Sequence, residues 1–325
     1  MSLDRRVVGI IANPLSGKDI RRVVAQATVF PNHEKVNILR RVLLGMAAVG
    51  VDEVLAMPDS AGLIERARDG LELPFPVRQV ELSVTATAED STRAAALMRE
   101  AGARCLVTLG GDGTCRAVAR GAGQVPLLPL STGTNNAFPF FVEGTLAGMA
   151  AASAAASRDQ QMLARLPALQ LLRSEEPVDL ALVDVAVLSG GLGARAVWEY
   201  ERISLVVTTR LHPGTVGLSA IGGAVGADAP ESAAAVAVTL GGDRRQILAP
   251  VAPGVIRRLP VADIRWLADG ELIDLPSSSA LALDGEREYL TRSERWSVRP
   301  IAGGPYVVLV DRAIQALYRR ERVYG

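Results

Sequence analysis

The chain has 325 residues, of which 49% are hydrophobic and 22% are charged, enough apolar material for the cores of two globular domains. Its 35 Lys and Arg residues balance 35 Asp and Glu residues, so it lacks the basic excess of a nucleic-acid-binding protein. Two cysteines and two histidines argue against a disulfide framework and a histidine-rich zinc site. There is no signal-peptide pattern and no apolar segment of membrane-spanning length, so we expect a cytoplasmic protein that binds neither nucleic acid nor membranes.

Residues 1–140 alternate between two kinds of pattern. Short apolar or β-branched runs predict strands over 7–12, 51–56, 77–82 and 105–109. Apolar residues at helical spacing predict helices over 38–49, 61–68, 89–101 and 114–120. Such alternation predicts a Rossmann-like α/β domain with a parallel sheet, whose ligands bind at the carboxyl ends of the strands.

The pattern changes after residue 140. One Ala-rich helix is expected over 145–157, and short strands separated by turns follow over 181–188, 203–208, 234–240, 246–250, 279–283 and 296–300. We therefore expect an antiparallel β-sandwich substrate domain over 141–304. The strand-then-helix pattern over 305–325 predicts a return of the chain to the nucleotide-binding domain of residues 1–140.

The sequence Gly110-Gly111-Asp112-Gly113-Thr114 lies between a predicted strand and a predicted helix. Binding of a triphosphate needs several backbone N–H groups at a helix N-terminus, with no Cβ in the way, and three glycines permit that approach. Asp112 can hold a divalent metal or take the proton of an acceptor hydroxyl, and Thr114 can cap the helix.

The hexapeptide 107–112 occurs a second time, as residues 238–243. There it is followed by Arg244-Arg245 and a β-like run instead of a helix, which predicts a hairpin turn. Only the first copy has the strand–loop–helix context of a phosphate-binding loop.

Gly110–Thr114 resembles the signature loop of NAD kinases, diacylglycerol kinases and sphingosine kinases. Two stretches resemble elements of the lipid-kinase branch, namely Asn13–Gly17, with the pattern Asn-Pro-x-Ser-Gly, and Pro129–Phe138. Pro213–Gly223 resembles a run of NAD kinases, and Ala282–Glu286 resembles an Asp-Gly element of both branches. The order of these matches is typical of the NAD kinase/diacylglycerol kinase superfamily, and their mixture is most similar to the ATP-NAD-kinase-like acetoin-catabolism protein X subgroup.

The resemblance implies an NAD kinase-like two-domain architecture and Mg²⁺-ATP-dependent phosphoryl transfer to a hydroxyl in the interdomain cleft, with Asp112 as acid/base or metal ligand. It makes Glu286 either a second catalytic carboxylate, as in lipid kinases, or a solvated turn acid. The residues expected to bind ATP are Asn13, Ser16, Gly17, Gly110, Gly111, Gly113, Thr114, Thr132, Gly133, Thr134 and Asn135. Those expected to bind the acceptor are Asn136, Asp184, His212, Gly214, Thr215 and Asp284. We also expect a homo-oligomer, either a dimer or a tetramer.

One departure from the resemblance concerns the acceptor. NAD kinases carry an Asn followed by an acid on a strand that contacts the adenosine of NAD, and the matching stretch here is 181–185. Asp184 keeps the acid, whereas Val183 stands at the Asn position. The acceptor that we expect is NAD or a related small or nucleotide-like molecule. The alternatives are a lipid kinase and a nucleotide-binding regulator with weak or no catalysis, and the donor is ATP or polyphosphate.

Overall fold

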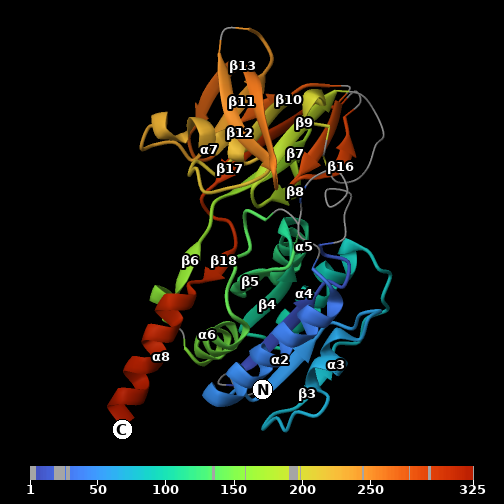
Figure 1. Cartoon of the computed structure of the whole chain (residues 1–325), viewed down its shortest axis with the longest axis vertical. Helices are drawn as coiled ribbons and strands as arrows, with labels where there is room; N and C mark the ends of the chain where they lie inside the picture. The colour runs from blue at the N-terminus through green and yellow to red at the C-terminus, as the bar shows by residue number, and fades with distance from the viewer. Residues whose placement is uncertain are drawn as a thin grey trace.

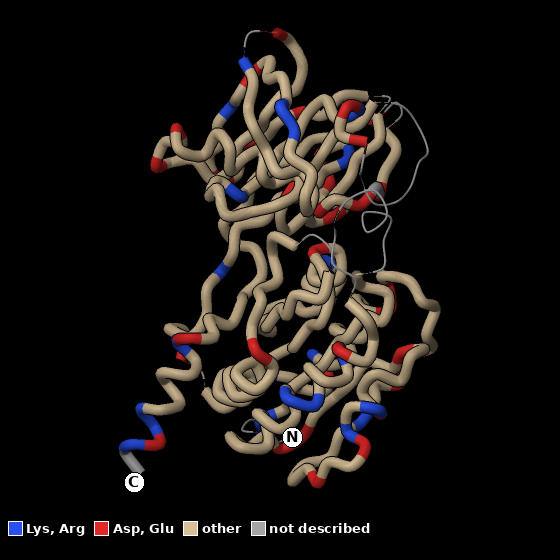
Figure 2. The backbone as a smooth tube through the Cα atoms, viewed as in Figure 1, with Lys and Arg blue, Asp and Glu red and all other residues tan. Residues whose placement is uncertain are grey.

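The structure is a computed structural model that describes residues 5–17, 26, 30–133, 136–157, 159–189, 197, 199–243, 245–277, 279–291 and 294–324. The chain forms two lobes, an α/β lobe and an all-β lobe, with β6 and β18 leading from one to the other (Figure 1). Acidic and basic residues are interspersed over both lobes (Figure 2). No helix within the described ranges is long and apolar enough to cross a membrane.

The α/β lobe contains a seven-stranded sheet in the order β3-β2-β1-β4-β5-β18-β6. Its pairs are parallel except for the edge pair β18–β6. The continuous apolar runs of β1 and β4 are buried along their whole length, as expected for a sheet covered on both faces. The strands are β1(Val7–Ala12), β2(Glu53–Ala56), β3(Val77–Gln79), β4(Cys105–Gly110), β5(Leu127–Ser131), β6(Leu163–Arg165) and β18(Tyr306–Val308).

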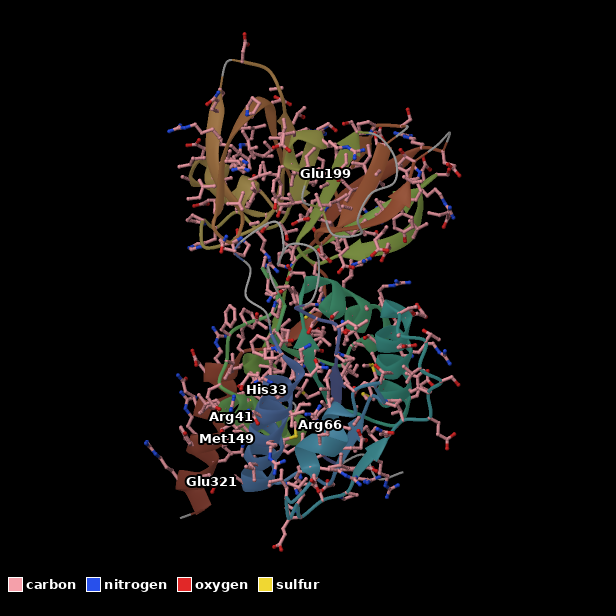
Figure 3. All side chains as sticks on the ribbon, turned by 45° about the vertical axis from the view of Figure 1, so that its right-hand side comes forward. His33, Arg41, Arg66, Met149, Glu199 and Glu321 are labelled. Carbon is pink, nitrogen blue, oxygen red and sulfur yellow. The ribbon has the colours of Figure 1, made fainter. Side chains whose placement is uncertain are left out.

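Helices cover both faces of this sheet. Those packed in one apolar layer are α2(Asn32–Val49), α3(Leu63–Arg68), α6(Gly144–Ala156) and α8(Val310–Tyr324), and those in the other are α4(Ala88–Glu100) and α5(Asp112–Ala122). Helices α2 and α6 touch backbone to backbone, since a Cβ on Gly148 would lie 2.0 Å from the carbonyl oxygen of Val42. Arg41 and Met149 mark this helix pair in Figure 3.

The all-β lobe is a sandwich. A seven-stranded sheet in the order β12-β13-β11-β10-β9-β15-β16 packs on a four-stranded sheet in the order β14-β17-β7-β8, with one apolar core between them. Helix α7(Ala220–Val225) covers the outer face of the larger sheet. The strands are β7(Ala168–Arg173), β8(Glu176–Ala181), β9(Asp184–Ser189), β10(Ile203–Thr208), β11(Ala235–Leu240), β12(Gln246–Ala252), β13(Val255–Leu267), β14(Ile273–Leu275), β15(Ser279–Leu283), β16(Glu286–Leu290) and β17(Trp296–Ile301). Three 3-10 turns, Gln160–Met162, Tyr200–Arg202 and Gly226–Asp228, complete the regular structure described.

The predicted fold class, an α/β domain followed by an antiparallel β-sandwich, is confirmed. Two local predictions are wrong. The strand expected over 181–188 begins only at Asp184, as β9, because β8 ends at Ala181 and the chain turns at Leu182 and Val183. The turn after β11 does not close a hairpin, because β13 lies between β11 and β12 and pairs with both.

The two lobes share a small buried core. Cys115 of α5 and Phe138 pack with Leu182 and Val183 of the β lobe, and Ala168 and Val307 complete the cluster. Beyond the boundary expected at residue 140, α6 packs on α2 and β6 pairs with β18, so these elements extend the α/β layer. Because the shared core includes α5, that helix is held directly against the second lobe.

Candidate active site

The strand order of the α/β lobe reverses between β1 and β4. From β1 the chain proceeds to β2 and β3 on one side, and β4 and β5 then continue on the other side. Open α/β sheets bind ligands outside the carboxyl ends of their strands at such a reversal. Asn13 directly follows β1 and Gly111 directly follows β4, so the two predicted phosphate-binding segments meet there.

A pocket of about 210 Å³ opens at this point. Its walls come from the segments after β1, β2, β4 and β5, from the start of α4 and from the β15–β16 turn. Its described lining includes five carboxylates and no Lys, Arg or His side chain. The lining acids are Asp59, Asp90, Asp112, Asp284 and Glu286.

The turn after β1 is tied to the start of α5. The N–H of Asn13 donates to the carbonyl of Leu109 at 3.0 Å, and its Nδ2 donates to Thr114 Oγ1 at 2.9 Å. Its Oδ1 accepts the N–H of Leu15 at 2.8 Å. Asn13 therefore fixes both its own turn and the helix that carries Asp112.

A buried lysine supports the same turn from behind. The Lys35 side chain is fully buried, and its Nζ donates to the carbonyl oxygens of Asn13 at 2.9 Å, Pro14 at 3.2 Å and Ser16 at 2.8 Å. Its charge therefore lies directly behind a turn that lines the pocket, where it favours an anion. Sequence reasoning missed Lys35, although it is one of only two lysines in an arginine-rich chain.

Each glycine between the end of β4 and the first turn of α5 faces a specific neighbour. A Cβ on Gly110 would lie 2.4 Å from Cβ of Thr114, one on Gly111 2.9 Å from Oδ1 of Asn136, and one on Gly113 2.8 Å from Oε1 of Glu286. Gly110 lies inside β4 and does not line the pocket, whereas Gly111 and Gly113 do. These glycines therefore permit close approach of the two lobes and of the neighbouring loop.

Asp112 is the first residue of α5 and is 9% exposed. Its carboxylate accepts the N–H of Phe138 at 2.8 Å and that of Ala137 at 3.0 and 3.1 Å. These bonds fix the orientation of the carboxylate, because both donors are backbone N–H groups. Asp112 lines the larger pocket and also a smaller one of about 10 Å³ on the side of the β lobe.

The β15–β16 turn brings two further acids to Asp112. Asp284 and Gly285 have φ values of +52° and +76°, as in a type I′ hairpin turn, for which Asp-Gly is a preferred pair. The Asp284 carboxylate accepts the N–H groups of Leu182 at 3.1 Å and Val183 at 2.8 Å. Glu286, the first residue of β16, lies against Gly113.

Burial raises the pKa of Asp284 to about 7, with a further contribution from Asp112 and an opposing one from the Arg116 guanidinium. Asp284 therefore holds its proton up to nearly neutral pH. A pair of neighbouring acids in unlike environments is the arrangement that separates a proton donor from a proton acceptor.

The smaller pocket lies between Asp112 and the β lobe. Asp184, Tyr200 and Ser219 contribute its polar walls, and Val197, Val216, Leu218 and Val251 its apolar walls. Arg210 lies close by and sequence reasoning missed it. Burial lowers the pKa of its guanidinium, while Asp112, Asp284 and Asp184 raise it. Its guanidinium also lies 5.7 Å from the centre of the Phe138 ring.

The structure brings most of the predicted site residues together. Those that line the larger pocket are Asn13, Ser16, Gly17, Gly111, Asp112, Gly113, Thr114, Gly133, Asn136, Asp284 and Glu286. Asp184 lines the smaller one. Thr132 lines neither, because it is fully buried with its Oγ1 3.0 Å from Oγ of Ser16. Thr134 and Asn135 lie outside the described residues.

The loop after β10 also lines neither pocket with its predicted residues His212, Gly214 and Thr215. Nδ1 of His212 accepts the N–H of Gly214 at 3.2 Å, which closes a local turn. Among the described residues, no group of three or more His, Cys, Asp or Glu side chains is arranged to hold a metal ion. The described part of the chain therefore offers Asp112 no ready-made set of protein ligands for a cation.

Both domains of the chain match known protein families. Residues 8–156 match the ATP-NAD kinase N-terminal domain, and residues 167–302 match the acetoin catabolism protein X C-terminal domain. The chain is 39% identical over 308 residues to acetoin catabolism protein X of Cupriavidus necator. The aligned region covers 87% of this chain and 84% of that protein. Two solved structures of a putative diacylglycerol kinase from Bacillus anthracis str. Sterne align with a TM-score of 0.42 over 94% of this chain and 98% of theirs, at 10% and 9% identity.

The matched N-terminal domain and the site at its sheet define a kinase-fold protein with an NAD kinase-like N-terminal domain. The chain belongs to the acetoin catabolism protein X family. The resemblance inferred from the sequence motifs is confirmed.

Proposed function

We propose that the chain is an ATP-dependent phosphotransferase that moves a phosphoryl group to a hydroxyl of a small or nucleotide-like acceptor in the cleft between its domains. One observation carries the proposal: Asp112 borders both pockets at the switch point of the parallel sheet. The triphosphate would occupy the larger pocket, along the 13–17 turn and the start of α5, and the acceptor hydroxyl would approach from the β lobe.

In this mechanism Asp112 takes the proton of the acceptor hydroxyl, and the oxygen of that hydroxyl forms a bond to the γ-phosphorus. The bond from that phosphorus to the bridging oxygen breaks, and a nucleoside diphosphate leaves. The backbone N–H groups of Ala137 and Phe138 keep the Asp112 carboxylate in place. Positioning and electrostatics supply most of the rate in such a reaction.

The donor set of the larger pocket fits a nucleotide that arrives with Mg²⁺. Five carboxylates line it without a described basic side chain, so the charge of a bare triphosphate would be repelled there. Mg²⁺ would take most of its ligands from phosphate oxygens and water, and it needs only one or two carboxylates, which lining acids other than Asp112, such as Glu286, would supply. When bound there, the cation would supply electrostatic neutralisation of the charge that develops on the transferred group.

The stretch that matches the NAD-contacting strand does not select NAD as the acceptor, because its residues 182 and 183 are buried. Leu182 and Val183 are packed in the core that joins the lobes, so their side chains are not available to a ligand. Asp184, Tyr200 and Ser219 would meet the acceptor instead. These three polar side chains would suit a small hydroxylated acceptor as well as a nucleotide.

The test is isothermal calorimetry with Mg²⁺-ATP, ATP with EDTA, and polyphosphate, followed by an assay of ADP release with NAD, nucleosides and small polyols as acceptors. We expect metal-dependent binding and acceptor-dependent ADP release. Binding without release for any acceptor would favour a regulator, and absence of binding by any donor would refute the proposal.

A lipid acceptor is the second candidate because two apolar side chains stand at the pocket rim. Leu15 and Val84 both line the larger pocket and are 55% and 43% exposed. The same side chains suit a nucleobase, and their place in the donor pocket favours that role. Sedimentation with vesicles containing diacylglycerol, and ADP release in their presence, separates the two.

A further inference from the structure

Helix α5 carries a second charged residue toward the β lobe, one turn after Asp112. Arg116 is 4% exposed and stands four positions after Asp112, so both side chains lie on the same face of the helix. That face also carries part of the core shared by the two lobes, because Cys115 packs against Leu182 and Val183.

The Arg116 guanidinium meets three carboxylates from three segments of the β lobe. Nη1 lies 2.9 Å from Oδ2 of Asp179 on β8, and Nε lies 3.5 Å from Oδ2 of Asp284 in the β15–β16 turn. Nη2 donates to Oε1 of Glu288 on β16. Tyr289 donates to the same Asp179 oxygen at 2.8 Å.

This cluster gathers three carboxyl groups around one guanidinium. The side chains of Asp179 and Asp284 are 2% and 0% exposed, so water does not screen them. Arg120, the next arginine along the helix, reaches Asp179 only at 3.8 Å and is 42% exposed. Arg116 is therefore the main cation that holds these buried acids together.

We infer that Arg116 is a positioning residue that anchors the β15–β16 turn to α5 and so fixes Asp284 and Glu286 relative to Asp112. It acts through these acids, because no atom of Arg116 lines either pocket. A guanidinium suits this role, since its planar fork of donors can bind several carboxylates at once, whereas an ammonium is a point charge. The inference rests on the proposed phosphotransfer.

The experiment compares Arg116→Met, Arg116→Lys and the control Arg120→Met with the wild-type protein. Each is checked for a cooperative melting transition, and then the dissociation constant of Mg²⁺-ATP and kcat are measured. For Arg116→Met we expect an unchanged nucleotide dissociation constant, within threefold, and a kcat lower by about 100-fold, the cost of roughly 1 Å of misplacement. Arg116→Lys should recover part of the loss, and Arg120→Met should stay within twofold.

A folded Arg116→Met variant with kcat within twofold of wild type overturns the inference and leaves the proposed function standing. A wild-type protein that transfers no phosphate overturns both, and this is known before any variant is made. If Arg116→Met does not fold, Asp179→Asn replaces it, because it keeps the side-chain shape and removes the charge 2.9 Å from the guanidinium. It should lower kcat about tenfold at unchanged nucleotide affinity, and an unchanged kcat overturns the inference.

Discussion

The same six residues, Val-Thr-Leu-Gly-Gly-Asp, occur at 107–112 and at 238–243 and form two different structures. In the first copy the glycines end β4, and Gly111 is the N-cap of α5 with φ −101°. In the second copy Gly241 and Gly242 have φ values of +119° and +75° and turn the chain away from β11. Asp112 is buried at the junction of the lobes, whereas Asp243 is exposed.

The reason for glycine also differs between the copies. A Cβ on Gly110 or Gly111 would collide with Thr114 or Asn136, whereas a Cβ on Gly241 would meet nothing within 4 Å. The first copy therefore uses glycine for close approach and the second for a left-handed backbone. Identical residues acquire different roles from their C-terminal neighbours, which are Gly113-Thr114 and a helix in one case and Arg244-Arg245 in the other.

The largest expected contrast comes from the two aspartates. Asp112→Asn should lower kcat by about 1,000-fold, because the amide does not accept the acceptor's proton. Asp243→Asn should leave kcat within twofold, since Asp243 is exposed. The measurement is steady-state ADP release, with circular dichroism to show that both variants fold. Equal activity of the two variants would contradict a catalytic role for the first copy.

The second contrast concerns Asp284, the buried acid beside Asp112, whereas Asp243 is exposed. The pKa of Asp284 is raised from 3.8 to about 7, so the protonated form stabilises the fold. That contribution is complete below pH 3.8 and is lost as the pH rises through about 7, with a size of a few kcal/mol. Asp284→Asn should remove this decline, which urea unfolding at a series of pH values measures. A variant whose unfolding free energy still falls by the same amount over that range would show that another group is responsible.

The third contrast uses the first glycine of each copy. Gly110→Ala should destabilise the protein by about 1–3 kcal/mol through overpacking against Thr114, and it should also lower kcat because Thr114 holds Asn13. Gly241→Ala should cost about 1–2 kcal/mol through its positive φ and leave kcat per folded molecule unchanged. Urea denaturation and ADP release are measured on both. Loss of kcat in Gly241→Ala would mean that the second copy reaches the site.

The smallest expected effect concerns the support of the first copy. Lys35→Met should weaken Mg²⁺-ATP binding about tenfold, or about 1.4 kcal/mol, and change kcat at saturation little, because Lys35 lies behind the turn and not beside the transferred group. Calorimetry and saturating kinetics separate the two quantities. A matched control is Arg40→Met. Arg40 also lies on α2, but its guanidinium donates to the carbonyl oxygens of Arg66 and Asp69, at the end of α3.

Much of the fold and the centre of the site could be predicted from local sequence. Apolar runs and helical spacing place β1, β4 and α4 to within one residue at each end, and they place α2 only from residue 38 although it begins at Asn32. The strand–glycine–helix order singles out Asp112. The sequence does not reveal Arg116, because its partners Asp179 and Glu288 lie 63 and 172 residues away. The sequence also does not indicate the roles of Lys35 and Arg210, because these roles depend on contacts that form only in the tertiary structure.

Two errors in the β lobe have physical causes. Ala181–Leu188 is apolar apart from Asp184, because Leu182 and Val183, at the turn between β8 and β9, are buried in the core between the lobes. β13 was not expected because it is rich in exposed charged residues and contains Pro260. The strand tolerates this proline because pairing passes from β12 to β11 at residues 260 and 261.

The position of β18 has a consequence for how the protein is made. β18 lies between β5 and β6, so the sheet that carries the site receives one of its interior strands from residues 306–308, which come after the whole β lobe in the chain. During synthesis, the ribosome must therefore release the β lobe before the first lobe can be completed. A nascent chain that already contains Asp112 has its sheet open at β5 until residues 306–308 emerge, and this long sequence separation slows completion of the sheet.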